Sequence, residues 1–234
     1  MRREIGVAGA VGALGWCAPA AAPVVPAVAA AFRLPRRLEP RRGIALTFDD
    51  GPHPLGTPAV LELLAAAGAR GTFFLVGEQV DRHPTVAAEI AAAGHEIGVH
   101  GYRHVLLLRR TPASVREDFA RAAATIGGAT GTAPRLYRPP YGVFSLAALR
   151  AVRQRGWTPL LWSKWGRDWE RGARPDEIAR KATRGLGPGD VVLLHDADSY
   201  SSADSWRRTV AALPAVLEAA RDTGEPLVSA SQST

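Results

Sequence analysis

The sequence contains very little cysteine and lysine. Cys17 is its only cysteine, so the chain has neither a disulfide framework nor a cysteine-based metal site. Lysine occurs only at Lys164 and Lys181, and the formal net charge of +7 therefore comes almost entirely from arginine. We interpret this excess first as a compositional bias, and alternatively as an attraction to an anionic polymer or an envelope surface.

Several kinds of motif are also missing. No basic helix with interleaved aromatic residues occurs, which argues against a nucleic acid partner. No Gly-x-Gly-x-x-Gly motif follows the first predicted strand, so a dinucleotide-binding fold is unsupported. The sequence has no internal repeat, and its 234 residues with 47% hydrophobic content suffice for one large domain. We expect the protein to be a monomer.

The first 40 residues differ in composition from the rest. Arg2 and Arg3 precede an apolar run over residues 5–18, and a proline-broken stretch follows. The pattern resembles a secretory signal with a cleavage site at residues 27–29, although a cluster of arginines behind the run weakens that interpretation. A cleaved signal, an uncleaved membrane anchor and a helical extension of the domain all stay open. We favour a secreted, envelope-bound or membrane-associated protein, with a cytoplasmic location as the alternative.

Over residues 41–234, predicted strands alternate with predicted helices. Short apolar or β-branched runs predict the strands, and apolar stripes that end at glycine predict the helices. The strands are expected at residues 44–48, 72–76, 96–99, 136–137, 158–162, 191–194 and, as a closing seventh strand, 226–228. The helices are expected at residues 58–65, 84–93, 112–126, 146–155, 175–183 and 206–221. Parallel strands joined by single helices predict an α/β fold, either an open doubly wound sheet or a barrel.

Chemically reactive residues follow several of these strands. In chain order they are Asp49, Asp50, His100, His104, Arg138, Asp168, Trp169 and His195. The carboxyl ends of the strands of a parallel barrel form one face, and active sites are built there. We therefore expect these side chains to lie close together.

A metal site is the simplest explanation for the two histidines and the aspartate pair. His100 and His104 are four residues apart, a spacing that places both imidazoles on one face of a helical turn. A carboxylate from Asp49 or Asp50 completes a set of two histidines and one carboxylate, which leaves coordination positions open for water and substrate. Spacing alone does not decide which of the two carboxylates is the ligand.

A metal-dependent hydrolase also needs a base and an acid. The carboxylate of the aspartate pair that does not bind metal can be the base. His195 can be the acid if a carboxylate such as Asp168 keeps it protonated near neutral pH. Arg138, which precedes two prolines, can pair with the base carboxylate and hold its charge.

Five motifs of the chain resemble those of a known family. They lie at residues 47–52 (TFDDGP), 100–104 (HGYRH), 138–142 (RPPYG), 167–169 (RDW) and 193–196 (LLHD). In order and spacing they are similar to the motifs of the polysaccharide deacetylases, the NodB-homology enzymes of carbohydrate esterase family 4. The resemblance extends over residues 43–228.

This resemblance implies a distorted, incomplete (β/α)7-8 barrel and the metal-dependent removal of N-acetyl groups, and sometimes O-acetyl groups, from glycans. It implies that Asp50, His100 and His104 bind a divalent metal ion, with zinc expected and cobalt as the alternative. Asp49 is then the general base, held in place by Arg138.

The same resemblance implies roles for five further residues. His195 is the general acid, and Asp168 is its partner. The backbone N–H of Tyr141 joins the metal in stabilising the oxyanion. Trp169 and Leu193 line the pocket for the acetyl methyl group.

Two positions depart from the family pattern. Gly101 stands where the second motif usually has Ser or Thr, which removes a loop hydrogen bond but no ligand. Trp165 stands where the fourth motif usually has Asp, and this leaves open how the loop is held and which sugars fit. Four loop residues are interpreted as loop packing, with a specialised acceptor site as the alternative: Tyr102 and Arg103, beside the ligands, and Asp198 and Tyr200, after His195.

The sequence therefore predicts a metal-dependent hydrolase that removes N-acetyl groups from N-acetylhexosamine units of a glycan or glycoconjugate. One alternative is that the same machinery acts on a non-glycan amide, a formamide or an O-acetyl ester. The other is a catalytically degenerate protein that binds glycan without turnover.

Overall fold

The computed structural model describes residues 17–231, which fold around one seven-stranded parallel sheet. The strands are β1 (Ala45–Asp49), β2 (Thr72–Leu75), β3 (Glu96–Val99), β4 (Leu136–Tyr137), β5 (Thr158–Pro159), β6 (Lys164–Trp165) and β7 (Val191–His195). Their order across the sheet is β5-β4-β3-β2-β1-β7-β6, and every pairing is parallel. Because β5 and β6 remain edges, the curled sheet is an incomplete barrel, and the predicted fold class is confirmed.

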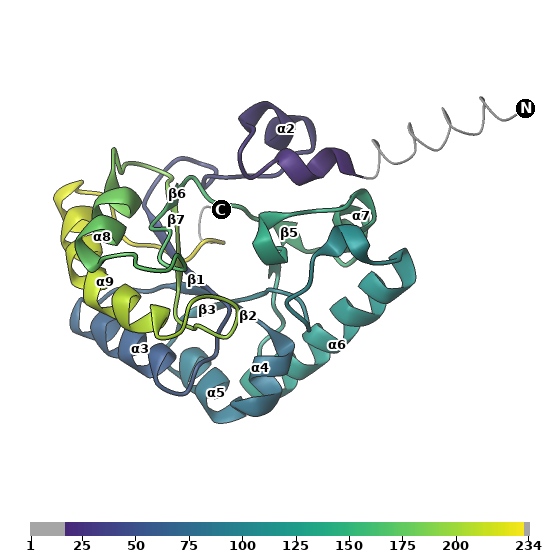
Figure 1. Cartoon of the computed structure of the whole chain (residues 1–234), viewed down its shortest axis with the longest axis horizontal. Helices are drawn as coiled ribbons and strands as arrows, with labels where there is room; N and C mark the ends of the chain where they lie inside the picture. Colours follow the sequence, from purple (N-terminus) through teal and green to yellow (C-terminus); the bar gives the residue numbers. More distant parts are fainter. Residues whose placement is uncertain (1–16, 232–234) are drawn as a thin grey trace, which may run out of the picture.

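Helices cover the outside of the curled sheet (Figure 1). They are α3 (Gly56–Ala66), α4 (Gly77–Arg82), α5 (Pro84–Ala92), α6 (Pro112–Thr130), α7 (Leu146–Gln154), α8 (Pro175–Thr183) and α9 (Ser205–Asp222). Two short 3-10 helices, η2 (Leu107–Arg109) and η3 (Pro140–Gly142), lie in connecting loops. None of the helices within residues 17–231 combines the length and apolar character that a membrane span requires.

The core forms around β1, which lies at the centre of the sheet. All five residues of β1 are buried, because neighbouring strands pair with both of its edges and helices cover its outer face. Phe48 of β1 pairs in register with Phe73 of β2, and the two rings stack with their centroids 5.0 Å apart. Continuous apolar runs of this kind are typical of parallel strands that are buried on both faces.

The segment before β1 lies against the open side of the barrel. Figure 1 shows η1 (Ala18–Ala21) and α2 (Pro26–Ala31) on the side of β5 and β6. The Arg36 Nε atom donates to the carbonyl oxygen of Trp162 at 3.1 Å, and Arg37 forms a 2.8 Å salt bridge with Asp190. This segment is thereby fastened to the chain that leads from β5 to β6 and to the start of β7.

The predicted N-terminal segment is only partly described. Its residues 1–16, with most of the apolar run, lie outside the described residues. The predicted cleavage site at residues 27–29 belongs to α2, where Ala29 is buried. Whether the segment is cleaved stays a prediction.

Several local predictions are wrong. Residues 226–228 form no strand but contribute one isolated bridge between Ile44 and Leu227. The sheet has seven strands because of the two-residue β6, which was not predicted. The strand predicted at 158–162 ends at Pro159. The helix expected to stop before Gly127 continues to Thr130, because Gly131 supplies the left-handed conformation (φ +66°) that ends it. The six-residue α4 is too short to show the apolar period that would predict it.

The Phe48–Phe73 contact leads to a prediction about stability. Substituting Phe73 by Ala removes a fully buried ring from the centre of the core, and we expect the free energy of unfolding to fall by about 3–5 kcal/mol. Guanidinium unfolding followed by circular dichroism measures this change. The control is Leu55→Ala, at a side chain that is 58% exposed, for which we expect a change of at most about 0.5 kcal/mol. Equal effects of the two substitutions would contradict the assignment of the core.

Candidate active site

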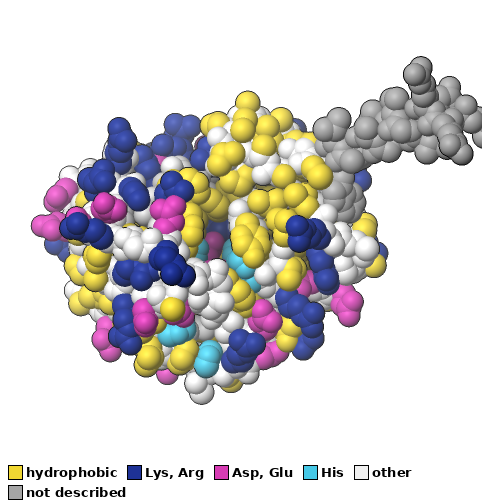
Figure 2. Space-filling view, viewed as in Figure 1, with side chains coloured by type: hydrophobic (Ala, Val, Ile, Leu, Met, Phe, Trp, Pro, Cys, Tyr) yellow, Lys and Arg dark blue, Asp and Glu magenta, His cyan; other side chains and the backbone are white. Residues whose placement is uncertain are grey.

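A cleft of about 240 Å³ opens at the carboxyl ends of the strands. Figure 2 shows histidine and acidic side chains at the bottom of a hollow in the centre of this face, with hydrophobic side chains beside them. The residues that line the cleft are Asp49, Asp50, His100, His104, Tyr141, Gly142, Trp162, Trp165, Trp169, Leu193, His195, Tyr200 and Ser201. The structure thus brings eight of the ten predicted site residues into one cleft, and Arg138 and Asp168 lie directly behind it.

The two adjacent aspartates have different surroundings. Asp49, the last residue of β1, accepts a hydrogen bond from Arg138 Nη1 at 2.7 Å through its Oδ1 atom. Asp50 follows in a left-handed conformation (φ +77°), and its Oδ1 atom lies 3.4 Å from His100 Nε2 and 3.3 Å from His104 Nε2. One carboxylate is therefore paired with a cation, and the other faces the two histidines.

The two histidines do not share a helical turn, and that prediction is wrong. They lie in an irregular loop after β3, in which Gly101 has a positive φ of +92°. Their rings still converge, with centroids 5.3 Å apart. The Nδ1 atom of His100 lies 2.8 Å from the carbonyl oxygen of Arg138, a contact that favours a proton on Nδ1 and leaves the Nε2 lone pair directed at Asp50.

The loop between the histidines is held by a residue that sequence reasoning missed. Asp118 of α6 is buried, and its two carboxylate oxygens accept hydrogen bonds from the backbone N–H groups of Tyr102 (2.8 Å) and Arg103 (3.2 Å). A Cβ atom at Gly101 would come within 3.3 Å of the same carboxylate. Asp118 therefore fixes the backbone of the loop between the two histidines, and no local signal in the sequence points to it.

The set Asp50, His100 and His104 fits a divalent metal ion. One ligand atom from each residue lies within 4.8 Å of the other two. Within residues 17–231, the buried Asp50 Oδ1 atom has no hydrogen-bond partner, as expected of an atom that faces a cation site. A carboxylate with two imidazoles is also a donor set typical of catalytic metal sites.

The charges of these groups suit a cation as well. Burial raises the pKa of Asp50, but the adjacent His100 and the charges of His195 and His104 have a larger opposite effect. The resulting pKa of Asp50 is about 2. Burial lowers the pKa of His104 to about 4, because the opposing effect of Asp50 is smaller. At neutral pH the set therefore offers an ionised carboxylate and an uncharged His104 imidazole, the forms that bind metal.

Arg138 is fully buried behind the cleft. Besides Asp49, its guanidinium donates to Thr47 Oγ1 (2.8 Å) and to the carbonyl oxygens of Leu160 (3.1 Å) and Leu161 (3.0 Å). Burial lowers the pKa of Arg138, while the charge of Asp49 and its hydrogen bond oppose that shift. With four acceptors around it, the guanidinium holds the Asp49 carboxylate in one orientation.

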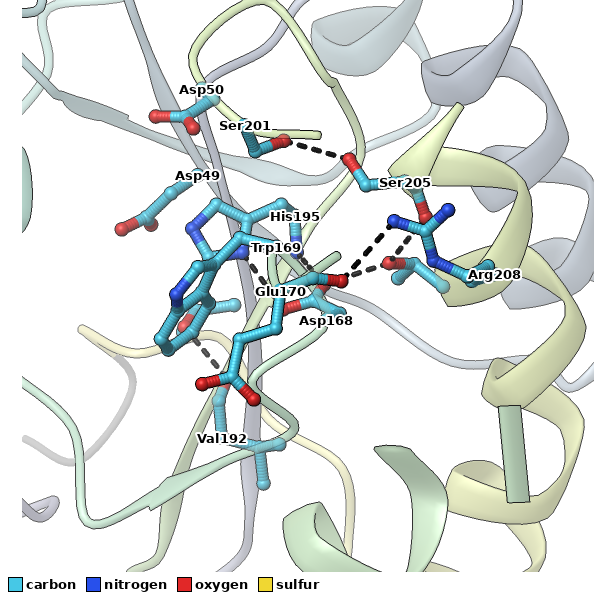
Figure 3. A network of polar contacts seen from close by, with 12 residues as sticks. Asp49, Asp50, Asp168, Trp169, Glu170, Val192, His195, Ser201, Ser205 and Arg208 are labelled. Carbon is cyan, nitrogen blue, oxygen red and sulfur yellow. Dashed lines mark hydrogen bonds and ion pairs between the residues drawn. The ribbon is translucent and has the colours of Figure 1, made fainter. Parts of the chain in front are cut away.

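His195 ends β7 on the other side of Asp49, with which it pairs in register. Its Nδ1 atom lies 3.0 Å from Asp168 Oδ1, and its backbone N–H donates to Asp168 Oδ2 at 2.7 Å (Figure 3). The hydroxyl of Thr209 on α9 also donates to Asp168 Oδ2 at 2.7 Å. Burial lowers the pKa of His195, but the charge and hydrogen bond of Asp168, together with the charges of Asp50 and Asp49, outweigh burial and raise the pKa to about 10.

The remaining predicted residues form the walls of the cleft. Tyr141 has a left-handed backbone (φ +59°), and the edge of its ring meets His104 at a centroid distance of 4.6 Å. Trp169 meets His195 edge-on at 5.3 Å, and Leu193 lies in the same cleft. Tyr200 also lines the cleft, where it stacks flat on His104 at 4.3 Å while its hydroxyl donates to Glu78 at 2.6 Å.

Comparison with known proteins agrees with this geometry. A family model described as polysaccharide deacetylase matches residues 37–160. A chitooligosaccharide deacetylase of Bradyrhizobium sp. is 36% identical over 192 residues, which cover 78% of this chain and 86% of that protein. A peptidoglycan-N-acetylglucosamine deacetylase of Bacillus cereus is 34% identical over 191 residues, which cover 81% of this chain and 86% of that protein.

Solved structures show the same likeness. The Bc1960 peptidoglycan N-acetylglucosamine deacetylase superposes with a TM-score of 0.74 at 29% identity, with coverage of 80% of this chain and 85% of that one. The resemblance predicted from the five motifs is confirmed. The chain belongs to the polysaccharide deacetylase family.

Proposed function

We propose that this protein is a metal-dependent deacetylase that hydrolyses the N-acetyl groups of N-acetylhexosamine units in a glycan or glycoconjugate. The observation that carries the proposal is the separation of two adjacent carboxylates. Asp49 is bound by Arg138, and Asp50 faces His100 and His104. The names of the relatives, which include chitooligosaccharide and peptidoglycan-N-acetylglucosamine deacetylases, support the same substrate class.

Asp50, His100 and His104 would hold the metal ion, which we propose to be zinc, with cobalt as the alternative. When bound, the ion lowers the pKa of a water molecule and polarises the amide carbonyl of the substrate. Nδ1 of His100 contacts the carbonyl oxygen of Arg138, so the orientation of this ligand is set before a metal arrives.

Asp49 acts as the general base in this proposal. Its Oδ1 atom is occupied by Arg138, whereas its Oδ2 atom lies 3.9 Å from His100 Nε2 and therefore faces the ligand set. A carboxylate at this position can accept a proton from the attacking water. Because Arg138 holds Oδ1, only Oδ2 of Asp49 faces the ligand set, and Asp50 is the carboxylate that lies closer to the two histidines.

His195 acts as the general acid. Asp168 binds Nδ1 and stabilises the imidazolium, so the proton on Nε2 is available to the leaving amine. The backbone N–H of Tyr141 is proposed to bind the developing oxyanion, and Trp169 and Leu193 to surround the acetyl methyl group. The side chains of Trp169 and His195 are in contact, so the acid lies next to the proposed acyl pocket.

Further proposals concern the protein as a whole. We propose that residues 41–234 are the catalytic domain and that the N-terminal 40 residues associate it with the cell envelope. One chain supplies every residue of the proposed site, so the chemistry does not require an oligomer.

Acetate release tests the proposed function. Purified full-length chain is incubated with N-acetylglucosamine oligomers, with added zinc or cobalt and, in parallel, with a chelator. We expect acetate release that the chelator abolishes and that either metal restores. If no acetate is released while one metal ion is bound per chain, N-acetylhexosamine glycans are not the substrate. A panel of non-glycan amides, formamides and O-acetyl esters would then test the alternatives. No release and no bound metal would favour a glycan-binding protein.

Substitution of the two aspartates distinguishes their roles. We expect Asp49→Asn to lower kcat by about 10²- to 10⁴-fold without loss of metal, because the proton acceptor is removed while the ligand set stays intact. The matched variant Asp50→Asn should instead weaken metal binding. Metal content by mass spectrometry and steady-state kinetics measure the two effects. Near-native turnover of Asp49→Asn would show that the base is another group.

The raised pKa of His195 predicts the pH dependence. The acid must be protonated, so activity should persist into alkaline pH and fall as pH rises through the pKa of His195. Asp168→Asn removes the carboxylate charge that raises this pKa, so the alkaline limb of kcat/KM should move to lower pH. Thr209→Val is the control, because it removes one hydrogen bond to Asp168 but keeps the charge. An unchanged limb in Asp168→Asn would exclude His195 as the acid.

A further inference from the structure

Trp165 faces the interior of the barrel. It pairs in register with Leu193 of the parallel neighbour β7, so the two side chains lie on the same face of the sheet. The preceding residue, Lys164, lies on the opposite face of the sheet. Its Nζ atom donates hydrogen bonds to the carbonyl oxygens of Arg184 and Gly185, which follow α8. Trp165 and Leu193 both line the cleft.

The register also gives the depth of Trp165 within the barrel. Asp49 and His195 are paired across β1 and β7, and the pair two residues earlier is Thr47 with Leu193. Trp165 on β6 pairs with Leu193 and therefore lies at the same level of the sheet as Thr47 and Leu193. The indole therefore lies one layer of side chains below the proposed base and acid, at the floor of the cleft.

Neighbouring aromatic rings hold the indole of Trp165 in place. It meets Trp169 in a T-shaped arrangement at 5.6 Å and Trp162 at 5.7 Å. Trp169 in turn contacts His195 at 5.3 Å. Trp169 and Leu193 are the residues proposed to surround the acyl methyl group, and Trp165 touches the first and is paired with the second.

We propose that Trp165 closes the apolar end of the acyl pocket and thereby restricts the enzyme to acetyl groups. This inference rests on the proposed deacetylase function and deepens it. Trp165 is partly buried, and displacement of its indole by a longer acyl chain would disturb the contacts with both neighbouring rings. One methylene group in such a pocket changes the specificity constant by about 10- to 200-fold.

The test compares acyl chains of different length on the same sugar. The substrates are chitooligosaccharides with N-acetyl, N-propionyl or N-butyryl groups, and the amine produced by the metal-loaded full-length chain is measured. For the wild-type chain we expect kcat/KM to fall at least about 10-fold from acetyl to propionyl. For Trp165→Ala we expect the ratio of propionyl to acetyl turnover to rise at least about 10-fold, with Trp165→Leu intermediate.

The ratio of two substrates separates specificity from structural damage. A variant that is only partly folded loses both activities in proportion, so its ratio does not change. Trp157→Ala is the matched control, because this buried tryptophan stacks on Tyr137 outside the cleft lining. It should lose stability while keeping the wild-type ratio.

The outcomes that overturn the inference differ from those that overturn the function. If the wild-type chain releases acetate but Trp165→Ala keeps the wild-type ratio, Trp165 does not limit the acyl group. If Trp165→Ala instead raises KM increasingly with glycan length at a constant acyl ratio, the indole binds a sugar ring, and the acyl assignment is wrong. If the metal-loaded wild-type chain releases no acyl group at all, the proposed function itself fails.

Discussion

The buried ion pair between Arg138 and Asp49 is the interaction on which the rest of the site depends. A guanidinium without solvent exposure is strongly destabilising unless a carboxylate and hydrogen-bond acceptors surround it. Arg138 has both, because it binds Asp49 on β1 together with two carbonyl oxygens, of Leu160 and Leu161, beyond β5. The pair joins the end of β1 to the chain segments that follow β4 and β5, and it separates the surroundings of Asp49 from those of Asp50.

The site lies where regular strands give way to strained turns. Asp50, Tyr141 and Arg167 have φ values of +77°, +59° and +55°, which are unfavourable for residues other than glycine. They follow the ends of β1, β4 and β6. A left-handed residue turns the chain sharply, and Asp50, Tyr141 and Trp169 at these turns line the cleft. The cost of about 1–3 kcal/mol for each such residue is tolerated because buried contacts around the site stabilise these turns.

Local patterns predicted the elements that are long or buried on both faces. The apolar runs of β1 and β7 are examples, because a buried parallel strand needs no other signal. The two-residue β6 has no pattern of its own and exists because it pairs with β7. The loop between His100 and His104 was also misjudged, because contacts with distant residues determine its shape. Its spacing fits a helical turn, yet the positive φ of Gly101 and the hydrogen bonds that the backbone of the loop donates to Asp118 produce a different loop.

The sequence by itself determined which reactive residues follow which strands, and hence that they meet at one end of a parallel barrel. It also identified the family, because five short motifs in order are specific. The family resemblance implied that Arg138 holds Asp49 and that Asp50 joins the two histidines, but only the tertiary structure gives the distances between these groups. Only the tertiary structure places Trp165 one layer of side chains below His195. These placements depend on strand register and on contacts between residues far apart in the chain. Spacing along the chain carries no information about either.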